Sequence, residues 1–569
     1  MRELTRYAGR WVALAGDGSV VAAGDTALQA RQLAAEATAL SRPQVVWVSP
    51  HPPHITLPAW PLDELRRLLP EHGVWLAGGA VRDILMNRVP HDWDLVVSGS
   101  GLDLGRSVAN AFTGAYYPLD QERKTGRAIV NDPESGARVT LDFATLRGPD
   151  IIADLQGRDF TVNAMALTLD GELVDPTGGR QDLLDRQLRM THSRCFQDDH
   201  ARLLRAVRLG TALGLALESG TRNRIRDEAA SIVGTAPERV RAELVMLLAQ
   251  PDAPSGLSEL AALDLLPHVL PEIALGTGDT LARTVALLTH LGQVLALIAG
   301  RPTKGSEADS APTGWAVPIG WTAQPDWAWT ALSGAFACTQ SELSDYLAAP
   351  INADVCRGDL IRWAALFLAN EPSAAPTIHA GDGAAIPGDT TPRERLAANR
   401  LTHLRFSRAA VEFVSLIVAR ADSFSVLART ATCGGPNSSA VLGPDRRNVY
   451  RYFRETHEAG IAIALLSLAS TLAQAGARLD RVAWQHRCNV VRALTTAYFS
   501  RRDELVDPVP ILTGDDLMGL GIPQGPAVGR AIEQLREAQA IGEVSSMAEA
   551  QALARRFLSR LDTGGVGTC

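Results

Sequence analysis

Lysine is almost absent from this 569-residue sequence, which carries it only at positions 124 and 304. Nearly every positive charge is therefore arginine, whose planar guanidinium suits bidentate contacts to phosphates and base edges. A composition bias of the genome explains the same observation and is the simpler reading. An excess of basic charge is lacking as well, since the formal net charge is −8. Electrostatic attraction to phosphate normally comes with a basic excess, so any nucleic-acid contact has to be local.

Paired cysteines are also missing, and we expect no signal peptide in the first residues. The six cysteines are scattered without a CxxC pair, which indicates neither a zinc site nor a disulfide framework. Residues 1–20 lack the apolar segment of a signal peptide. The run 459–477 approaches membrane-span length, but its Ser, Thr and Gln residues favour a buried helix. We expect a cytoplasmic protein without a membrane segment.

The chain is too long for one hydrophobic core, so we expect several domains. Residues 1–55 predict a small ββαβ unit whose role the sequence does not reveal. Residues 56–190 alternate short strands with helices. From Asp198 onward the apolar residues recur at helical spacing. This helical part is divided into a neck (191–275), a body (276–505) and a tail (506–569).

The stretch "DWDLVV" (92–97) places two carboxylates in a run of strand-forming residues. Alternate side chains of a strand point the same way, so Asp92 and Asp94 share a face. Two carboxylates this close repel each other unless a cation lies between them. Magnesium prefers oxygen ligands and leaves positions open for substrate phosphates. The pair therefore predicts a site for two Mg²⁺ ions.

A glycine turn precedes the carboxylates in "VWLAGGAVRD" (74–83), which predicts a strand, a turn at Gly78 and Gly79, and a helix. Backbone N–H groups at the start of such a helix can approach an anion. Arg82 lies where it can reach the same phosphate. This arrangement suggests a triphosphate held against the metal ions.

The combination "LAGGAVRD...DWDLVV" resembles motif A of the nucleotidyltransferase branch that contains bacterial tRNA nucleotidyltransferases (CCA-adding enzymes) and bacterial poly(A) polymerases. The resemblance implies an α+β fold in which a head with a mixed β-sheet, similar to polymerase β, precedes an extended all-α neck, body and tail. A small extra α/β unit stands at the N-terminus. "RVTLDFATLRG" (138–148) is similar to the family's next strand, and Asp142 would be a third catalytic carboxylate.

Two further motifs continue the resemblance. "GRDFTVNAMAL" (157–167) resembles motif B, which implies that Arg158, Asp159 and Asn163 bind the nucleotide, with Arg158 and Asp159 reading the ribose. Gly157 replaces the family's first arginine. "QDDHARLLRAVRLG" (197–210) resembles motif D.

In that motif, Asp199 and Arg202 would select the base, and we expect them on one face of a helix. Adenine and cytosine share an exocyclic amine beside a ring-nitrogen acceptor, so one Asp and one Arg can accept both bases and reject guanine and uracil. Arg205 and Arg208 on the same helix would reach the triphosphate or the RNA backbone. Asp198 stands where the family usually has Glu.

The body resembles an HD-type domain that has lost its metal ligands. Leu368 and Ala369 occupy the positions of the His-Asp pair, and Ser470 stands where a ligand aspartate is usual. These side chains cannot bind a hard cation, so we expect no phosphohydrolase activity. The tail segment 512–546 is similar to the tail of such enzymes and predicts helix, glycine-rich turn and helix, with tRNA binding as the expected role.

The resemblance predicts template-independent addition of CCA to tRNA 3′ ends from CTP and ATP. The expected partners are tRNA and the two nucleotides, with no stable protein partner. A poly(A) polymerase, or an enzyme that adds only CC or only A, is the nearest alternative. A catalytically inactive RNA-binding protein and a metal-dependent phosphohydrolase are the others.

Overall fold

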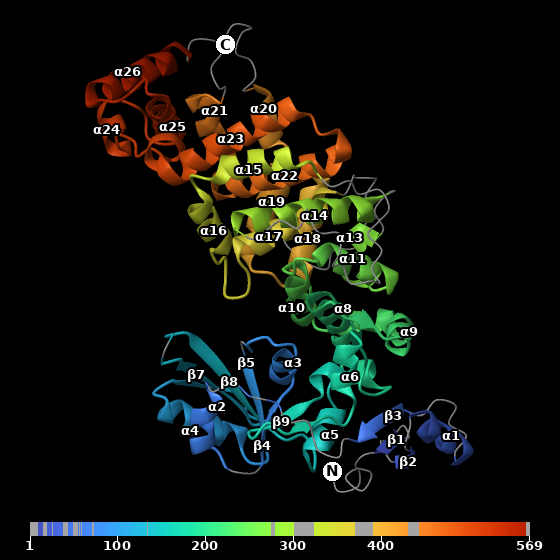
Figure 1. Cartoon of the computed structure of the whole chain (residues 1–569). Coiled ribbons are helices and arrows are strands. Elements are labelled where there is room, and N and C mark those ends of the chain that lie inside the picture. The colour runs from blue at the N-terminus through green and yellow to red at the C-terminus, as the bar shows by residue number, and fades with distance from the viewer. Residues whose placement is uncertain are drawn as a thin grey trace. The chain divides into compact units, whose positions relative to one another are not determined.

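The structure is a computed structural model (Figure 1). It describes residues 10–14, 20–24, 27–37, 44–48, 55, 57, 60–70, 73–90, 92–133, 135–274, 279–300, 324–369, 391–430 and 443–564. The chain divides into two compact units, Met1–Gly234 and Thr235–Cys569. The division falls inside the range 191–275 expected for the neck.

The first unit begins with a small antiparallel sheet. Its elements are β1 (Arg10–Leu14), β2 (Val20–Gly24), α1 (Ala27–Ala37) and β3 (Gln44–Val48), with strand order β2-β1-β3. Ala30 and Ala34 of α1 pack against Ala13 of β1 in a core of small side chains. The ββαβ order is the one expected from the sequence, although the turn at Asp17 and Gly18 lies outside the described residues.

A seven-stranded mixed sheet forms the centre of the head, with strand order β10-β9-β4-β5-β8-β7-β6. Its strands are β4 (Val74–Ala77), β5 (Asp92–Val97), β6 (Ala115–Asp120), β7 (Thr125–Asn131), β8 (Arg138–Thr145), β9 (Ala166–Thr168) and β10 (Leu173–Val174). Strands β5 and β8 run parallel, and the other neighbouring pairs run antiparallel. The mixed sheet predicted for the head is confirmed.

Helices pack against the head sheet and continue beyond it. They are α2 (Leu62–Leu68), α3 (Gly79–Leu85), α4 (Gly101–Ala111), α5 (Ile151–Gln156), α6 (Gly179–Leu184), α7 (Cys195–Asp198), α8 (Arg202–Leu213) and α9 (Ser219–Glu228). Short turns η2 (Thr161–Asn163) and η3 (Ala229–Gly234) and a parallel strand pair, β11 (Gln187–Leu188) and β12 (Ala216–Leu217), complete the unit.

Side chains of β5 alternate between the two faces of the sheet, and this alternation decides on which face the Asp92 and Asp94 carboxylates lie. Trp93 and Leu95 are 3% and 0% exposed and belong to the main core of the head, together with residues of α4. Val96, on the other face, packs with Ile151 and Leu155 of α5. Asp92 and Asp94 share the face of Val96 because side chains alternate along a strand. The carboxylates therefore lie on the side of the sheet that α5 covers.

The second unit is helical in its described residues. Its first helices are α10 (Pro237–Leu248), α11 (Ala253–Ala262), α12 (Leu266–Val269), α13 (Pro271–Ala274), α14 (Thr280–Ile298), α15 (Asp326–Phe336), α16 (Gln340–Ala348) and α17 (Arg357–Leu368). They are followed by α18 (Pro392–His403), α19 (Arg408–Ala419), α20 (Ser423–Thr430), α21 (Arg446–Thr456), α22 (Gly460–Ala475) and α23 (Arg481–Ser500), with short turns η4 (His457–Ala459), η5 (Gly476–Arg478) and η6 (Arg502–Val506). The predominantly helical remainder predicted from the sequence is confirmed.

Two helical stretches, Thr280–Ile298 and Arg446–Ala475, are long and apolar enough to cross a membrane by length and composition alone. The second is interrupted at His457, where φ is 47°. Helix α22, which follows, is buried along most of its length and packs against α14. The buried helix expected over 459–477 is therefore confirmed for α22.

The C-terminal helices form a core of their own. They are α24 (Gly514–Gly519), α25 (Pro526–Ile541) and α26 (Met547–Gly564), and their buried residues include Leu517, Leu535 and Ala550. The glycine-rich turn between α24 and α25 contains Gly521 and Gly525, both at positive φ. The order of helix, glycine-rich turn and helix is the one expected from the sequence.

Candidate active site

The two carboxylates of β5 lie beside a third on the neighbouring strand. In the parallel pairing of β5 with β8, Asp94 is the partner of Asp142, and Asp92 is the partner of Thr140. Asp92 is exposed at the start of β5, whereas Asp94 and Asp142 are partly buried. The sheet register thus brings together the three carboxylates that the sequence singled out.

The Asp94 carboxylate has a raised pKa. Its pKa is raised to about 6, first by burial and then by the neighbouring charges of Asp142 and Asp92, while Arg158 and Arg127 act in the opposite direction. Among the described residues, none donates a hydrogen bond to the Asp94 carboxylate. A partly buried carboxylate without a bonded donor is well suited to a cation.

Arg127 of β7 neutralises the third carboxylate. Its Nε and Nη2 each donate to one oxygen of Asp142 at 2.7 Å, in a bidentate pair. The hydrogen bond to Asp142 raises the pKa of Arg127 above its ordinary value. Asp142 is thereby occupied by a side chain of the protein. Arg127 was not predicted from the sequence, although the alternation of 125–131 places Thr125, Arg127 and Ile129 on one face and could have indicated it.

Gly78 allows the glycine turn to approach the carboxylates closely. It precedes α3 with φ of 72°, a conformation that favours glycine. A Cβ at this position would lie 2.8 Å from Arg158 Nη1 and 3.4 Å from Asp94 Oδ2. Gly79, the first residue of α3, lies against the guanidinium of Arg82. The turn, Arg158 and Asp94 therefore form one site, as motif A and motif B together predict.

A chain of hydrogen bonds links motif A, motif B and α8. Arg82 Nη1 donates to Asn163 Oδ1 at 2.8 Å, and Asn163 Nδ2 donates to Asp159 Oδ1 at 3.3 Å. Arg205 Nη1 then donates to Asp159 Oδ2 at 3.3 Å. These four residues were predicted from separate motifs to bind the nucleotide, and the fold brings them into one network.

Asp154 holds Arg158 in place and, like Arg127, was not predicted from the sequence. The Nε of Arg158 donates to Asp154 Oδ2 at 3.1 Å, and Arg147 N donates to Asp154 Oδ1 at 3.0 Å. Asp154 is only 4% exposed. The spacing of four residues within and just after α5 is the signal that could have revealed this pair.

The expected placement of Asp199 and Arg202 on one face of a helix is wrong. Asp199 has an extended backbone after α7, with φ of −157°, and α8 begins only at Arg202. The Asp199 carboxylate accepts a hydrogen bond from Ala201 N at 3.1 Å. A short acidic side chain often bonds in this way to the backbone two residues on, which favours a turn over a helix.

Arg202 and Arg208, the two other arginines predicted to bind the nucleotide, lie on α8. Arg202 donates to Cys195 O at 3.2 Å and to Gly157 O at 3.4 Å, so its guanidinium lies against the start of motif B. Arg208 follows Arg205 by three residues on the same helix. Asp199 and Arg202 remain neighbours in the chain, with Asp199 in the turn that leads into α8.

The three positions of the body that correspond to metal ligands of HD-type domains lie on or directly after two helices. Leu368 is the last residue of α17, Ala369 follows it, and Ser470 lies in α22, which packs against α17. In the described part of the chain, the head included, no group of three or more His, Cys, Asp or Glu side chains is arranged to hold a metal ion, so a metal site in the head would have to use fewer protein carboxylates. The absence of phosphohydrolase activity stays a prediction.

Comparisons with known proteins identify the family. Residues 74–189 match the poly A polymerase head domain, and residues 214–275 match the probable RNA and SrmB-binding site of polymerase A. The chain is 30% identical over 506 residues to the CC-adding tRNA nucleotidyltransferase of Geobacter sulfurreducens, which covers 88% of this chain and 95% of that protein. It is also 30% identical over 497 residues to the A-adding tRNA nucleotidyltransferase of Deinococcus radiodurans, covering 85% and 95%.

A solved structure supports the fold. The apo form of a CCA-adding enzyme superposes with a TM-score of 0.53 at 16% identity, covering 85% of this chain and 90% of that one. With this fold, the matched head and the two relatives of nearly full length, the chain belongs to the tRNA nucleotidyltransferase and poly(A) polymerase family that its motifs predicted.

Proposed function

We propose that this protein adds C and A nucleotides to the 3′ end of tRNA, using CTP and ATP and no nucleic-acid template. The observation that carries the proposal is the position of Asp92 and Asp94 on β5, on the face where the Gly78 turn and Arg158 meet. This geometry offers carboxylates for metal and donors for a triphosphate at one point. In a chain of this family, nucleotidyl transfer is the reaction that uses both.

Nucleotidyltransferases of this family are generally dependent on a divalent metal. We infer two Mg²⁺ ions held by Asp92 and Asp94. The fit rests on the Asp94 carboxylate, which is partly buried and has no bonded donor among the described residues. Magnesium commonly takes one or two protein carboxylates and completes its shell with water and substrate phosphates. Bound there, the metal would activate the primer 3′-hydroxyl and stabilise charge on the transferring phosphate.

Asp142 supports this site through its neighbours. Its bidentate pair with Arg127 fixes a carboxylate directly opposite Asp94 without adding an uncompensated charge. We propose that Asp142 and Arg127 position Asp94 and set the charge around it. A negative Asp142 without Arg127 would repel the incoming triphosphate.

The remaining residues divide into phosphate, sugar and base contacts. We assign the Gly78 and Gly79 turn and Arg82 to the triphosphate. We also move Arg158 from the ribose, where the resemblance placed it, to the triphosphate, because its guanidinium lies beside Gly78. Asp159 and Asn163 have acceptor groups suited to ribose hydroxyls, and Arg205 holds Asp159 in place. Arg208 extends the basic face of α8 towards a phosphate.

Asp199 and Arg202 are assigned to base selection. A carboxylate accepts from the exocyclic amine that adenine and cytosine share, and a guanidinium donates to the adjacent ring nitrogen. The Asp199 turn and the first residue of α8 place these groups next to each other in the chain. Guanine and uracil present a carbonyl in place of the amine, so the same pair would reject them.

Addition of CC alone or of A alone is the second candidate function. The two nearly full-length relatives, each 30% identical to this chain, are a CC-adding enzyme and an A-adding enzyme. The carboxylates and the motif B network serve every reaction of this family equally. Substrate tests therefore have to separate the two candidates.

The test is incorporation of labelled CTP and ATP, separately and together, with magnesium. The acceptors are three forms of one tRNA that end before CCA, after C and after CC. Addition of C, C and then A that stops supports the full reaction, and addition limited to C residues, or to a single A on the tRNA that ends after CC, supports the second candidate. Open-ended addition of A would instead mean a poly(A) polymerase. No incorporation with any acceptor would overturn the proposal and favour an inactive RNA-binding protein.

We also infer that the protein works in the cytoplasm and binds tRNA through its neck and tail. The tail has a compact core of its own, and its α25 begins after a glycine turn at Gly525. Cell fractionation with an antibody to the chain checks the location. Recovery of the protein in a membrane fraction would contradict it.

A further inference from the structure

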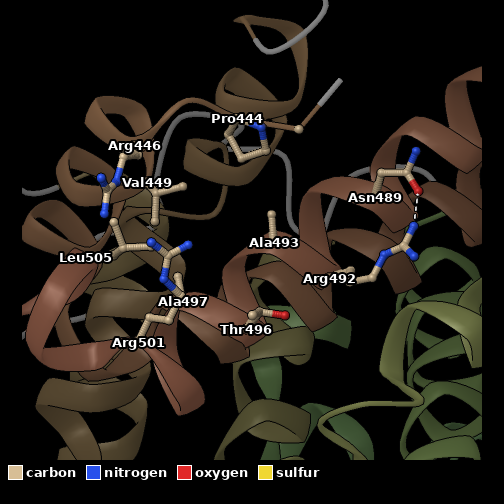
Figure 2. Close-up of a pocket in the computed structure, with 11 residues that line it drawn as sticks. Pro444, Arg446, Val449, Asn489, Arg492, Ala493, Thr496, Ala497, Arg501 and Leu505 are labelled. Carbon is tan, nitrogen blue, oxygen red and sulfur yellow. Dashed lines mark hydrogen bonds between the residues drawn. The ribbon is translucent and has the colours of Figure 1, made fainter. Parts of the chain in front are cut away.

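A second basic site lies in the helical unit, far along the sequence from the carboxylates. A pocket of about 360 Å³ opens between α21, α23 and η6, as Figure 2 shows. Its lining residues are Gly443, Pro444, Arg446, Val449, Asn489, Arg492, Ala493, Thr496, Ala497, Arg501 and Leu505. None of them belongs to the residues assigned above to nucleotide or metal.

Hydrogen-bond donors dominate the polar part of this lining. Arg446, Arg492 and Arg501 bring three guanidinium groups, and Asn489 and Thr496 add an amide and a hydroxyl. The described lining includes no carboxylate. Since guanidinium forks match the oxygen geometry of phosphate, the pocket is suited to a phosphate-bearing ligand.

One end of the pocket already holds an anion of the protein. Arg446 and Arg501 both form ion pairs with Glu504, and Arg501 Nη2 lies 2.6 Å from it. Two guanidinium groups thus share one carboxylate, which leaves this end positive. The Nε of Arg446 is buried and has no hydrogen-bond partner among the described residues.

The other end carries Arg492, whose counter-charge is not supplied by any described residue. Arg492 Nη2 donates to Asn489 Oδ1 at 2.5 Å. No acidic side chain in the described part of the chain forms an ion pair with Arg492. Figure 2 shows this pair on one side of the pocket and Arg446 and Arg501 on the other.

Small and apolar side chains separate the two basic ends. Ala493 and Ala497 of α23 lie between them, with Val449 and Leu505 beside Arg446 and Arg501 (Figure 2). A single inorganic phosphate would use one end only. A nucleic-acid strand presents successive phosphates separated by sugars, and this alternation matches two basic ends with an apolar floor between them.

We propose that this pocket binds the phosphodiester backbone of an RNA strand. The identity of this RNA as the tRNA substrate rests on the proposed function. Arg492 contacts one phosphate, and Arg446 and Arg501 contact another. The protein thereby gains affinity for tRNA at a site that takes no part in nucleotide selection.

The test compares Arg492→Glu and Arg492→Lys with Arg420→Glu. Arg492 is exposed, so its replacement leaves the core of α23 intact. Arg420 is an exposed arginine at the end of α19 and lies outside the pocket, which makes it a matched control for charge reversal. Thermal unfolding of each variant checks the fold. The measurements are kcat and KM for tRNA, KM for the nucleotides, and tRNA affinity over a range of salt.

Reversing the charge at a phosphate contact should raise KM for tRNA about tenfold or more. The values of kcat and of KM for CTP and ATP should change less than about twofold, because the pocket residues lie outside the nucleotide network. The slope of log affinity against log salt should fall by about 0.7 to 0.9, the value of one lost phosphate contact. Arg492→Lys should keep most of the affinity, and Arg420→Glu should behave as wild type.

A second arm separates the sources of phosphate. Binding of inorganic phosphate and of AMP is measured by calorimetry with wild type and Arg492→Glu. If Arg492→Glu abolishes binding of these small ligands and leaves KM for tRNA and the salt slope unchanged, the RNA proposal is overturned. An equal loss in Arg420→Glu would also overturn it, since the effect would then be one of net charge.

Failure of the proposed function would look different. If wild-type protein incorporates no nucleotide, the pocket is tested by direct binding of a labelled tRNA, with the same variants and salt series. A loss of affinity and of salt slope confined to Arg492→Glu supports the pocket even then. Equal binding by wild type and Arg492→Glu overturns the pocket whatever the activity.

Discussion

The head keeps carboxylates at the positions where its family resemblance predicts metal ligands, whereas the helical body has lost them. On β5 the chain keeps Asp94 partly buried, with its pKa raised to about 6 by burial and by neighbouring carboxylates. In the body, Leu368 ends α17 and Ala369 follows it, where the resemblance leads one to expect a histidine and an aspartate. Partly burying a carboxylate costs stability, so such groups persist mainly where function requires them. The contrast indicates that the chemistry is concentrated in the head.

The surroundings of these positions also differ, being charged around Asp94 and apolar in the middle of α17. Asp94 has Asp142, Arg127 and Arg158 as electrostatic neighbours, which together set the charge of the site. Trp363, in the middle of α17, is 0% exposed and packs edge-on against Phe406 at 5.0 Å. A variant in the head should therefore act on the reaction, and a variant in the body should act on stability.

The largest effect is expected from Asp92→Ala. Loss of this carboxylate removes a metal ligand, and metal contributes several kcal/mol to transition-state stabilisation, so incorporation should fall about a thousandfold or more. Asp92 is exposed at the start of β5, and thermal unfolding should be unchanged. Asp103→Ala, an exposed aspartate in the first turn of α4, is the matched control. Incorporation near the wild-type rate by Asp92→Ala would sink the mechanism.

A smaller effect is expected from Arg127→Ala, which leaves Asp142 without its bidentate partner. The freed charge would disturb the neighbouring Asp94, and loss of such a supporting group typically costs about 10- to 100-fold. Because Arg127 acts through the carboxylates, the half-saturating magnesium concentration should also change. Arg127→Lys should restore part of the rate. Arg123→Ala, in the exposed turn after β6, should leave both quantities unchanged, and equal losses in both variants would remove Arg127 from the site.

The strand and turn around the carboxylates were predictable because they depend on local rules. Alternation places Asp92 and Asp94 on one face, and the glycine pair ends β4 before α3, as found. The positive φ of Gly78 follows from the local turn, but the contacts of Gly78 do not. Its closeness to Arg158 joins residues eighty positions apart in the chain and follows from the sheet order.

The parts that the sequence analysis missed depend on pairing between strands or on competition within a turn. Arg127 meets Asp142 because β7 pairs antiparallel with β8, a register that single-sequence patterns do not specify. Asp199 looked helical from its spacing to Arg202, but its carboxylate bonds to Ala201 N and stops α7 before α8 begins. Local side-chain bonding to the backbone outweighed helical periodicity there.

In the body, Trp363→Ala should lower the free energy of unfolding of the second unit by about 3–5 kcal/mol, the usual cost of removing a buried aromatic side chain. Incorporation per folded molecule should stay within about twofold of wild type below the unfolding temperature. Trp327→Ala, at a partly exposed position on α15 beside Arg481, should cost less. A large loss of kcat in folded Trp363→Ala protein would contradict the division of roles.

The smallest effect, none at all, is expected when the protein is assayed for phosphohydrolase activity with Mn²⁺, Ni²⁺ or Mg²⁺ on bis-p-nitrophenyl phosphate and on 2′,3′-cyclic nucleotides. Leucine and alanine at 368 and 369 offer no ligand atoms in their side chains, and the Ser470 hydroxyl is a poor substitute for a carboxylate. Asp92→Ala serves as the control, because any hydrolysis by the head would depend on its carboxylates. Metal-dependent hydrolysis that survives in Asp92→Ala would place a working site in the body and end the contrast with the head. Hydrolysis that disappears with Asp92 would instead assign it to the metal site on β5 and leave the contrast intact.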